Sequence, residues 1–195
     1  MCGYFNLRTE KLHAQFSCAT VEIFTNIWYY EAKDGGSVMN FSHCDTDERH
    51  LSLHDCIAER AYFENGKLVF EFNDGFWISP DHPDSNLSKA FRTDFSKVEY
   101  TLEDGADYDV TIYVFEKTFF KRTIRYEWTV QDLINNINLG KCKLEFLYQY
   151  VDFHSRIVEC ELKLNKKPYH QECIMKISAP NVSYYWNNLC KDRPW

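Results

Sequence analysis

The sequence is poor in the residues and runs that mark several large classes of protein. It has only seven glycines and five prolines in 195 residues, and no segment approaches the roughly 18 uninterrupted apolar residues that span a bilayer. It contains no G-x-S-x-G motif, no phosphate-binding glycine loop and no dinucleotide fingerprint. We therefore expect no membrane span and no cofactor, and an enzymatic function lacks support.

Positive charge is also scarce. The chain has 22 lysines and arginines against 29 aspartates and glutamates, which gives a formal net charge of -7. A nucleic-acid backbone would be repelled by this balance, so nucleic acid is not an expected partner. The first residues, MCGYFNLRTEKLHAQFSC, lack the basic start and apolar run of an export signal. We expect a cytoplasmic protein whose eight cysteines stay reduced and mainly fill the core.

Aromatic side chains, by contrast, are abundant and make up 17% of the chain. They fit a pleated, half-buried sheet better than a helix, and the apolar content of 45% is enough to build a core. We predict a mainly β fold, an antiparallel sandwich or bent sheet built from two hairpin-rich halves.

Two turn dipeptides, Asn65-Gly66 and Asp74-Gly75, each separate a pair of strand-like runs. Such dipeptides tolerate the positive φ of tight hairpins, so we predict a three-stranded meander over residues 57–79. The core side of its middle strand is formed by alternating apolar residues: Leu68, Phe70 and Phe72.

A second meander is predicted over residues 97–128, where three more segments alternate in the same way: 97–103, 109–115 and 121–128. One helix follows over residues 130–138, because Thr129 can cap its N-terminus and Gly140 lies just past its end. A strand over residues 141–151 then places four alternating residues on one face: Leu144, Phe146, Tyr148 and Tyr150.

An internal repeat links residues 51–79 with residues 151–178. At an offset of 100, three pairs coincide: His54 with His154, Ile57 with Ile157, and Glu59 with Glu159. A structural duplication and a chance similarity both stay open, as does whether the halves form one core or two.

The repeat bears on the run LHDC, which ends at Cys56. His54, Asp55 and Cys56 could form a reactive centre, or they could mark the start of a strand. Cys56 corresponds to Arg156 in the second copy, and a catalytic thiol is not expected where the duplicate is arginine. We favour a strand-start motif, in which His and Asp bond to nearby backbone groups.

The pattern of an apolar residue, His54 and Asp55, then Ile57 and an alternating hairpin, resembles a loose group of small bacterial β-rich proteins of unknown function. Some of these are similar to immunity proteins of toxin systems. The resemblance covers mainly residues 51–79, with a weaker copy at 153–178 where Ser155 departs from the pattern. It implies binding of a partner rather than catalysis.

Residues 43–56 hold the densest set of potential metal ligands, and the candidates are His50, His54 and Asp55. The segment has no C-x-x-C pair, so a polar loop before a strand explains the same residues. A metal-dependent hydrolase that uses this cluster is the alternative function.

A second candidate site lies in SYYWNNL, where Tyr184, Tyr185 and Trp186 could anchor a protein interface. Stacking of these rings on sugars would instead make the chain a carbohydrate-binding module.

The role of residues 1–38 has two interpretations. The run KDGGSVM has two adjacent glycines whose codons can spell a ribosome-binding sequence before Met39, which would make residues 1–38 a wrongly included leader. Alternatively, residues 19–30 add a strand at a sheet edge. In both cases residues 39–195 are expected to form a single β-rich domain.

These observations together predict a non-enzymatic, intracellular protein-binding protein of the immunity type. Its acidic charge favours a basic protein partner. The sequence leaves the identity of that partner and the oligomeric state open.

Overall fold

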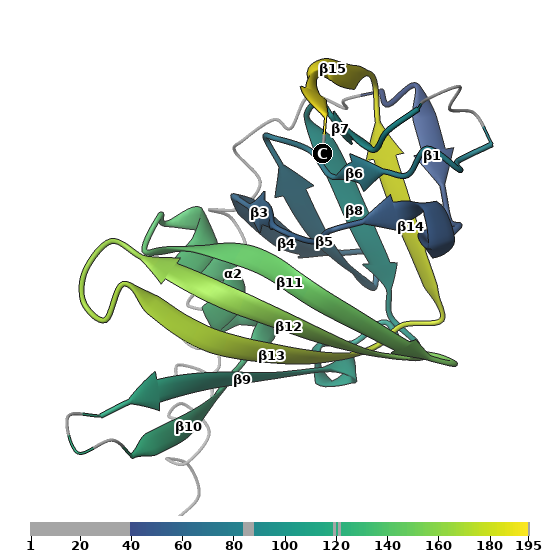
Figure 1. Ribbon diagram of the computed structural model, residues 1–195. Helices are drawn as coiled ribbons and strands as arrows, with labels where there is room; N and C mark the ends of the chain where they lie inside the picture. Colours follow the sequence, from purple (N-terminus) through teal and green to yellow (C-terminus); the bar gives the residue numbers. More distant parts are fainter. Residues whose placement is uncertain (1–39, 84–87, 119, 121, 195) are drawn as a thin grey trace, which may run out of the picture. The chain divides into compact units, whose positions relative to one another are not determined.

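The computed structural model describes residues 40–83, 88–118, 120 and 122–194, and strands dominate this part of the chain. The expected fold class is confirmed: the described residues form three antiparallel sheets and one α-helix (Figure 1). The predictions for residues 1–38 lie outside the described residues. No helix of the described part is both long and apolar enough to cross a membrane.

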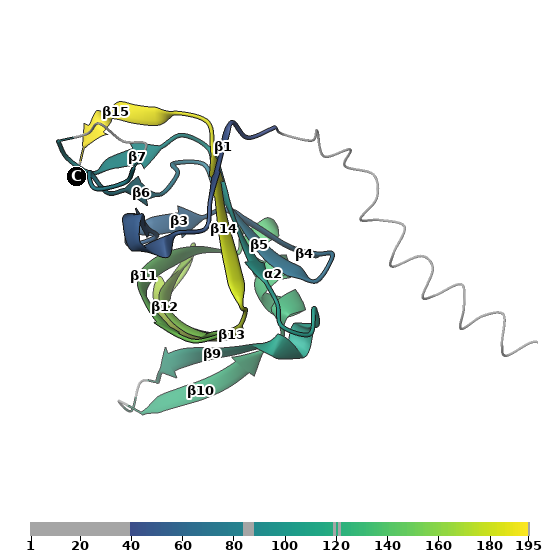
Figure 2. The same cartoon turned by 90° about the vertical axis from the view of Figure 1, so that its right-hand side faces the viewer.

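The largest sheet has six strands, and its two edges are β10 and β3. In spatial order the strands are β10 (Thr123–Trp128), β9 (Val110–Lys117), β13 (His170–Ser178), β12 (Ser155–Leu164), β11 (Cys142–Asp152) and β3 (Cys56–Ala58). Figure 2 shows how strongly β11, β12 and β13 curve.

Two further sheets complete the fold. The five-stranded sheet runs in the order β1 (His43–Asp45), β14 (Asn181–Trp186), β8 (Ser96–Thr101), β5 (Lys67–Phe72) and β4 (Arg60–Glu64). The four-stranded sheet runs in the order β15 (Leu189–Pro194), β7 (Phe91–Thr93), β6 (Trp77–Ile78) and β2 (Leu51–Ser52). Two short 3-10 helices, η2 (Glu48–His50) and η3 (Asp107–Asp109), lie between strands.

The core lies between the five-stranded and six-stranded sheets. Phe146 of β11 packs edge-on against Phe70 and Phe72 of β5, with ring centroids 5.3 and 5.5 Å apart. Edge-to-face packing of this kind is favourable for aromatic rings. Buried residues of both predicted halves belong to one hydrophobic cluster.

The helix α2 (Val130–Asn138) confirms the predicted one. Thr129 accepts a hydrogen bond from the Asp132 N–H, and the Asp132 carboxylate accepts one from the Thr129 N–H, which forms a capping box. Its apolar stripe is buried and consists of Val130, Leu133, Ile134 and Ile137. Gly140 follows the helix with a φ of 65°, as a helix C-terminus requires.

The predicted turn at Asn65-Gly66 is also confirmed, because both residues have positive φ and join the antiparallel strands β4 and β5. The three-stranded meander is wrong in its third strand. After Asp74-Gly75 the chain enters β6, which pairs with β2 and β7 rather than with β5. The second meander is wrong only in its first strand, because β8 pairs with β5 and β14, whereas β9 and β10 pair antiparallel with each other in the six-stranded sheet as predicted.

The single face expected for the strand over residues 141–151 is a further error. The pairing of β11 with β12 shifts between Phe146 and Tyr148, so Leu147 is an extra residue in a β-bulge. Such an insertion reverses the phase of the alternation. Phe146 is therefore buried, whereas Tyr148 and Tyr150 are exposed on the opposite face.

The two predicted half-repeats contribute their hairpins to different sheets. The first supplies β4 and β5 to the five-stranded sheet, and the second supplies β12 and β13 to the six-stranded sheet. The duplication itself stays a prediction.

A buried polar network joins these sheets to η2. Arg156 of β12 is 3% exposed and donates to Glu48 Oε1 at 2.6 Å and to the Ala179 carbonyl. The other Glu48 oxygen accepts from Gln149 of β11 at 2.6 Å, and Gln149 accepts from the Tyr100 hydroxyl at 2.9 Å. Each of these links satisfies a group that would be costly to bury alone.

Removing the Glu48 carboxylate should therefore destabilise the fold. We expect Glu48→Ala to lower the free energy of unfolding by about 3 kcal/mol, because Arg156 would remain buried without its counter-charge. Urea unfolding measures this. Arg49→Ala in the same short helix is the control and should leave stability nearly unchanged, because Arg49 is largely exposed. Equal effects of the two variants would contradict the role of the network.

Glycine is required at position 75 because the backbone of another segment approaches it closely, and not because of a hairpin turn. A Cβ at this position would overlap the backbone oxygens of Thr93 and Asp94, and its φ of 68° disfavours other residues. We expect Gly75→Ala to cost about 3 kcal/mol. Gly140→Ala is the matched control, since Gly140 has a similar φ but open space around it, and it should cost only about 1 kcal/mol. Similar urea midpoints for the two variants would refute the close approach.

Candidate functional site

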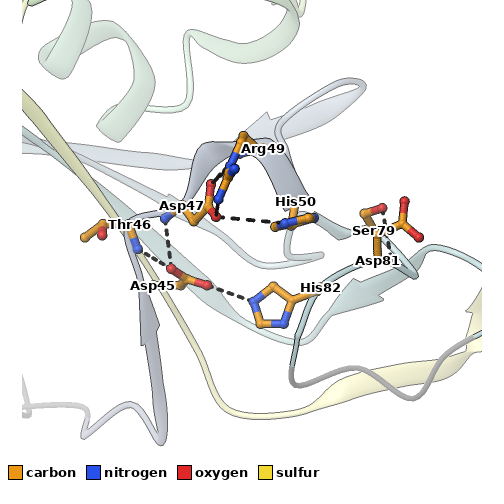
Figure 3. Close-up of polar contacts among 8 residues, drawn as sticks. All are labelled: Asp45, Thr46, Asp47, Arg49, His50, Ser79, Asp81 and His82. Carbon is orange, nitrogen blue, oxygen red and sulfur yellow. Dashed lines mark hydrogen bonds and ion pairs between the residues drawn. The ribbon is translucent and has the colours of Figure 1, made fainter.

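The expected ligand cluster of residues 43–56 folds into β1, η2, β2 and the start of β3. The best-organised contact of this segment joins Asp45 to His82, which lies outside it, and is shown in Figure 3. His82 is 3% exposed and its Nε2 lies 2.8 Å from Asp45 Oδ2. Asp45 Oδ1 also accepts the N–H groups of Thr46 at 2.6 Å and Asp47 at 2.8 Å.

These contacts change the acidity of Asp45. Burial alone would raise the pKa of its carboxyl, but the Asp47 N–H, His82 and the Thr46 N–H outweigh that effect and lower it. The ionised carboxylate is thus the form that the fold stabilises. It connects β1 to the chain that follows β6.

His50 lies beside this pair without completing a metal site. Its Nε2 is 3.8 Å from Asp47 Oδ2, and its ring is edge-on to His82 with centroids 6.1 Å apart. Asp47 is also held by Arg49, whose hydrogen bond and charge hold the pKa of Asp47 well below its usual range. Among the described residues, no group of three His, Cys, Asp or Glu side chains is arranged to hold a metal ion.

A shallow cavity of about 150 Å³ lies next to η2. It is lined by Arg49, His50, Leu51, Ser52, Trp77, Ser79 and Ala90. Neither Asp45 nor His82 lines this cavity.

The LHDC motif occupies a turn and the start of β3. Asp55 has a φ of 57° and its N–H donates to the Phe146 carbonyl at 2.8 Å, while Nδ1 of His54 bonds to the Leu147 carbonyl. These two bonds fix the chain at the β-bulge in β11. The ring of His54 lies over Tyr148, with centroids 5.2 Å apart.

Cys56, the third polar residue of the motif, is fully buried. Burial raises the pKa of its thiol to about 12, although Arg92 lies within reach and opposes the shift. The thiolate that a nucleophile requires is therefore strongly disfavoured at neutral pH. This placement fits the strand-start interpretation of the motif.

Alternation along β14 separates the three aromatic candidates near the end of the chain. Tyr184 and Trp186 lie in the core, and Tyr185 points to the other face. The Tyr185 hydroxyl lies 3.3 Å from Glu99 Oε2, and Lys97 Nζ is 4.6 Å from its ring centroid. Only Tyr185 of the three keeps exposed surface for a ligand or a partner.

A further group of exposed apolar side chains lies elsewhere, on the face of the six-stranded sheet that points away from the core. We call it the outer face. Its exposed apolar residues near the bulge are Tyr148 (56%), Tyr150 (54%) and Ile157 (41%). Tyr150 pairs directly with Ile157 across β11 and β12. These residues form a contiguous patch rather than isolated side chains.

Carboxylates cross the same face next to this patch. Glu145, Glu161 and Glu172 are opposite one another on three adjacent strands, and Glu159 is opposite Tyr148. Like charges placed directly opposite each other on neighbouring strands are destabilising.

Cations compensate only part of this acidic line. Lys163 bonds to Glu145 at 2.7 Å, and His170 bonds to Glu161 at 2.6 Å. Within the described residues, Glu159 and Glu172 have no ion-pair partner. The outer face therefore offers two carboxylates without a counter-ion beside exposed aromatic rings.

Sequence reasoning missed this surface because no local signal marks the bulge at Leu147. The alternating apolar residues of β11 favour one continuous face, and the phase change arises from bonds to His54 and Asp55, which are distant in sequence.

Comparisons with known proteins add no family to this description. No protein-family model matches the chain, and no curated protein or solved structure matches it either.

Asp45 gives a test of this region through pH. Its lowered pKa means that its ionised form contributes stability above about pH 4, and that this contribution is lost as the pH falls through the folded-state pKa. We expect Asp45→Asn to cost about 1–2 kcal/mol at pH 7 and clearly less at pH 3. Urea unfolding at both pH values measures this.

The exposed aspartate Asp192 on β15 supplies the control for that experiment. Asp192→Asn should have little effect at either pH. A cost of Asp45→Asn that stays the same from pH 7 to pH 3 would show that the carboxylate charge is not what the fold uses.

Proposed function

We propose that this chain is a non-enzymatic, intracellular protein-binding protein that masks a basic partner, as an immunity protein does. The outer face of the six-stranded sheet is the proposed binding surface. The observation that carries the proposal is the position of Glu159, an unpaired carboxylate directly opposite the exposed ring of Tyr148.

The apolar part of the outer face supports an interface. The inner face of the same sheet packs on the core, so the outer face of an isolated protein is expected to be polar. Instead, Tyr148, Tyr150 and Ile157 are each between two-fifths and three-fifths exposed. Tyrosine is common at interface centres because it buries a large area with few rotatable bonds.

The charges of this face support a basic partner, and arginine in particular. A guanidinium can stack on a tyrosine ring and bond to a carboxylate at the same time. Tyr148 and Glu159 lie opposite each other on adjacent strands, which places a ring and a carboxylate within reach of one arginine side chain. Glu172 adds a second unneutralised charge, and the formal net charge of -7 favours the approach of a cationic protein.

The thiols support the proposed intracellular location. Cys56, Cys142, Cys160 and Cys173 are free thiols that are buried in the core. Buried, unpaired thiols are typical of proteins in reducing compartments.

Peptide binding tests the proposal. The probes are three labelled peptides of equal length in which serine alternates with arginine, lysine or glutamate, and fluorescence anisotropy measures their affinity for the full chain. We expect the arginine peptide to bind most tightly, with an affinity that falls as salt rises. Glu159→Lys should weaken its binding about tenfold, since a close charge pair is replaced by repulsion.

Two further variants make this experiment specific. Tyr148→Ala should reduce the preference for arginine over lysine, because the stacking surface is lost. Asp192→Lys changes the net charge by the same amount on the four-stranded sheet and should leave binding nearly unchanged. An equal loss in Glu159→Lys and Asp192→Lys, or equal binding of the glutamate peptide, would refute the proposed surface.

A further inference from the structure

The edge strand β10 has features that the binding surface proposed above does not use. It is the last strand on one side of the six-stranded sheet, and no strand of the described residues pairs with its other side. Figure 1 shows it at the margin of the sheet. Its residues from Thr123 to Glu127 are all exposed, including Ile124 at 42% and Tyr126 at 43%.

The hydrogen bonding of the β9–β10 hairpin shows which backbone groups of β10 are unpaired. The Thr118 N–H donates to the Arg122 carbonyl at 2.8 Å, so these two residues form a hydrogen-bonded pair. Hydrogen-bonded and non-bonded pairs alternate along an antiparallel ladder. The N–H and C=O groups of Thr123, Arg125 and Glu127 therefore point away from β9, toward the free edge.

We propose that β10 pairs antiparallel with β10 of a second copy of the chain, about a two-fold axis at Tyr126. The two six-stranded sheets would then form one continuous sheet. This inference is independent of the partner-binding function proposed above.

Charge selects this register among the possible ones. In it, Arg125 is opposite the partner's Glu127, and Glu127 is opposite the partner's Arg125, so the symmetry produces two ion pairs. A shift of the pairing by two residues in one direction would place Arg125 opposite the partner's Arg125. A shift of the same size in the other direction would place Glu127 opposite the partner's Glu127. Both shifts place like charges directly across the strands, which is unfavourable.

The apolar side chains of β10 fit the same register. Tyr126 meets the partner's Tyr126 at the axis, and Ile124 lies opposite the partner's Trp128, on the face that continues from the core. Trp128 and Tyr126 pair with buried Ile112 and Val114 of β9 within one chain. A second copy would thus extend the covered apolar surface by contacts that are identical in both subunits.

The expected affinity is modest. Pairing of two six-residue strands with three apolar side chains each buries less than the roughly 1,600 Å² of a standard interface. We expect a dissociation constant in the micromolar range or weaker, with monomer and dimer in equilibrium.

Sedimentation velocity over a concentration series tests the pairing through charge reversal. The wild-type chain should shift from monomer to dimer as concentration rises. Arg125→Glu and Glu127→Arg should each weaken dimerisation at least tenfold, because each places like charges opposite each other. The double variant with both changes should restore it. A monomeric wild-type chain at every concentration, or a double variant no better than the single ones, would overturn the proposal.

A cross-linking experiment tests the register. In the proposed dimer the two Tyr126 residues form a non-hydrogen-bonded pair, with Cα atoms about 4.5 Å apart, close enough for a disulfide. Tyr126→Cys should give a covalent dimer on mild oxidation, beyond any formed by the wild-type chain. Ile124→Cys is the control, since its two copies lie about 13 Å apart along the strands. Equal cross-linking of both variants would overturn the register.

Discussion

The buried guanidinium of Arg156 is the constraint on which much of this structure depends. A charge removed from water needs a counter-charge and hydrogen-bond partners, or it costs several kcal/mol. The two terminal nitrogens of Arg156 have such partners, whereas its buried Nε has none among the described residues. Glu48 supplies the counter-charge and comes from η2, a short helix on a loop with no buried residue of its own. The ion pair therefore fixes a loop that apolar packing alone would not hold, and Asp45 and His50 at its two ends are positioned with it.

The bulge at Leu147 connects this buried network to the proposed binding face. Because one extra residue reverses the phase of β11, Gln149 reaches the interior, where it bonds to Glu48 and Tyr100. The same reversal places Tyr148 and Tyr150 on the outer face. Without the bulge, two tyrosines would point into the core and an amide would point to water. The hydrogen bond from Gln149 to Glu48 and the exposure of the aromatic patch thus follow from one irregularity.

The parts of the fold that could be predicted from sequence are those set by local chemistry. Asn65-Gly66 forms a hairpin because both residues accept positive φ, and α2 has its cap at Thr129 within one turn. Asp74-Gly75 has the same composition as a hairpin turn, but the glycine is required by the backbone of Thr93, which is distant in sequence.

The candidate site was predictable only in part, because it too depends on contacts between residues that are distant in sequence. Tyr184, Tyr185 and Trp186 were predicted as interface anchors, but they lie on the strand β14, whose alternation buries Tyr184 and Trp186. The metal candidates His50 and His54 lie on either side of β2: His50 Nε2 is 3.8 Å from Asp47 Oδ2, and His54 bonds to the Leu147 carbonyl. The exposed tyrosines of β11 depend on a bulge whose partners lie about 90 residues away, which no local pattern reveals.

The two edges of the six-stranded sheet differ in a way that bears on assembly. β3 has only three residues, two of them fully buried, so it offers little backbone to another chain. β10 has six residues, exposed along nearly its whole length. Proteins often protect such an edge with charged side chains, and Arg125 and Glu127 would repel a strand of uniform charge. Because Arg125 and Glu127 are opposite in sign and two residues apart, a strand of uniform charge would meet a like charge at one of them. A second copy of β10 that runs antiparallel instead places an opposite charge across from each. The edge is thus protected against general aggregation and complementary to a second copy of itself.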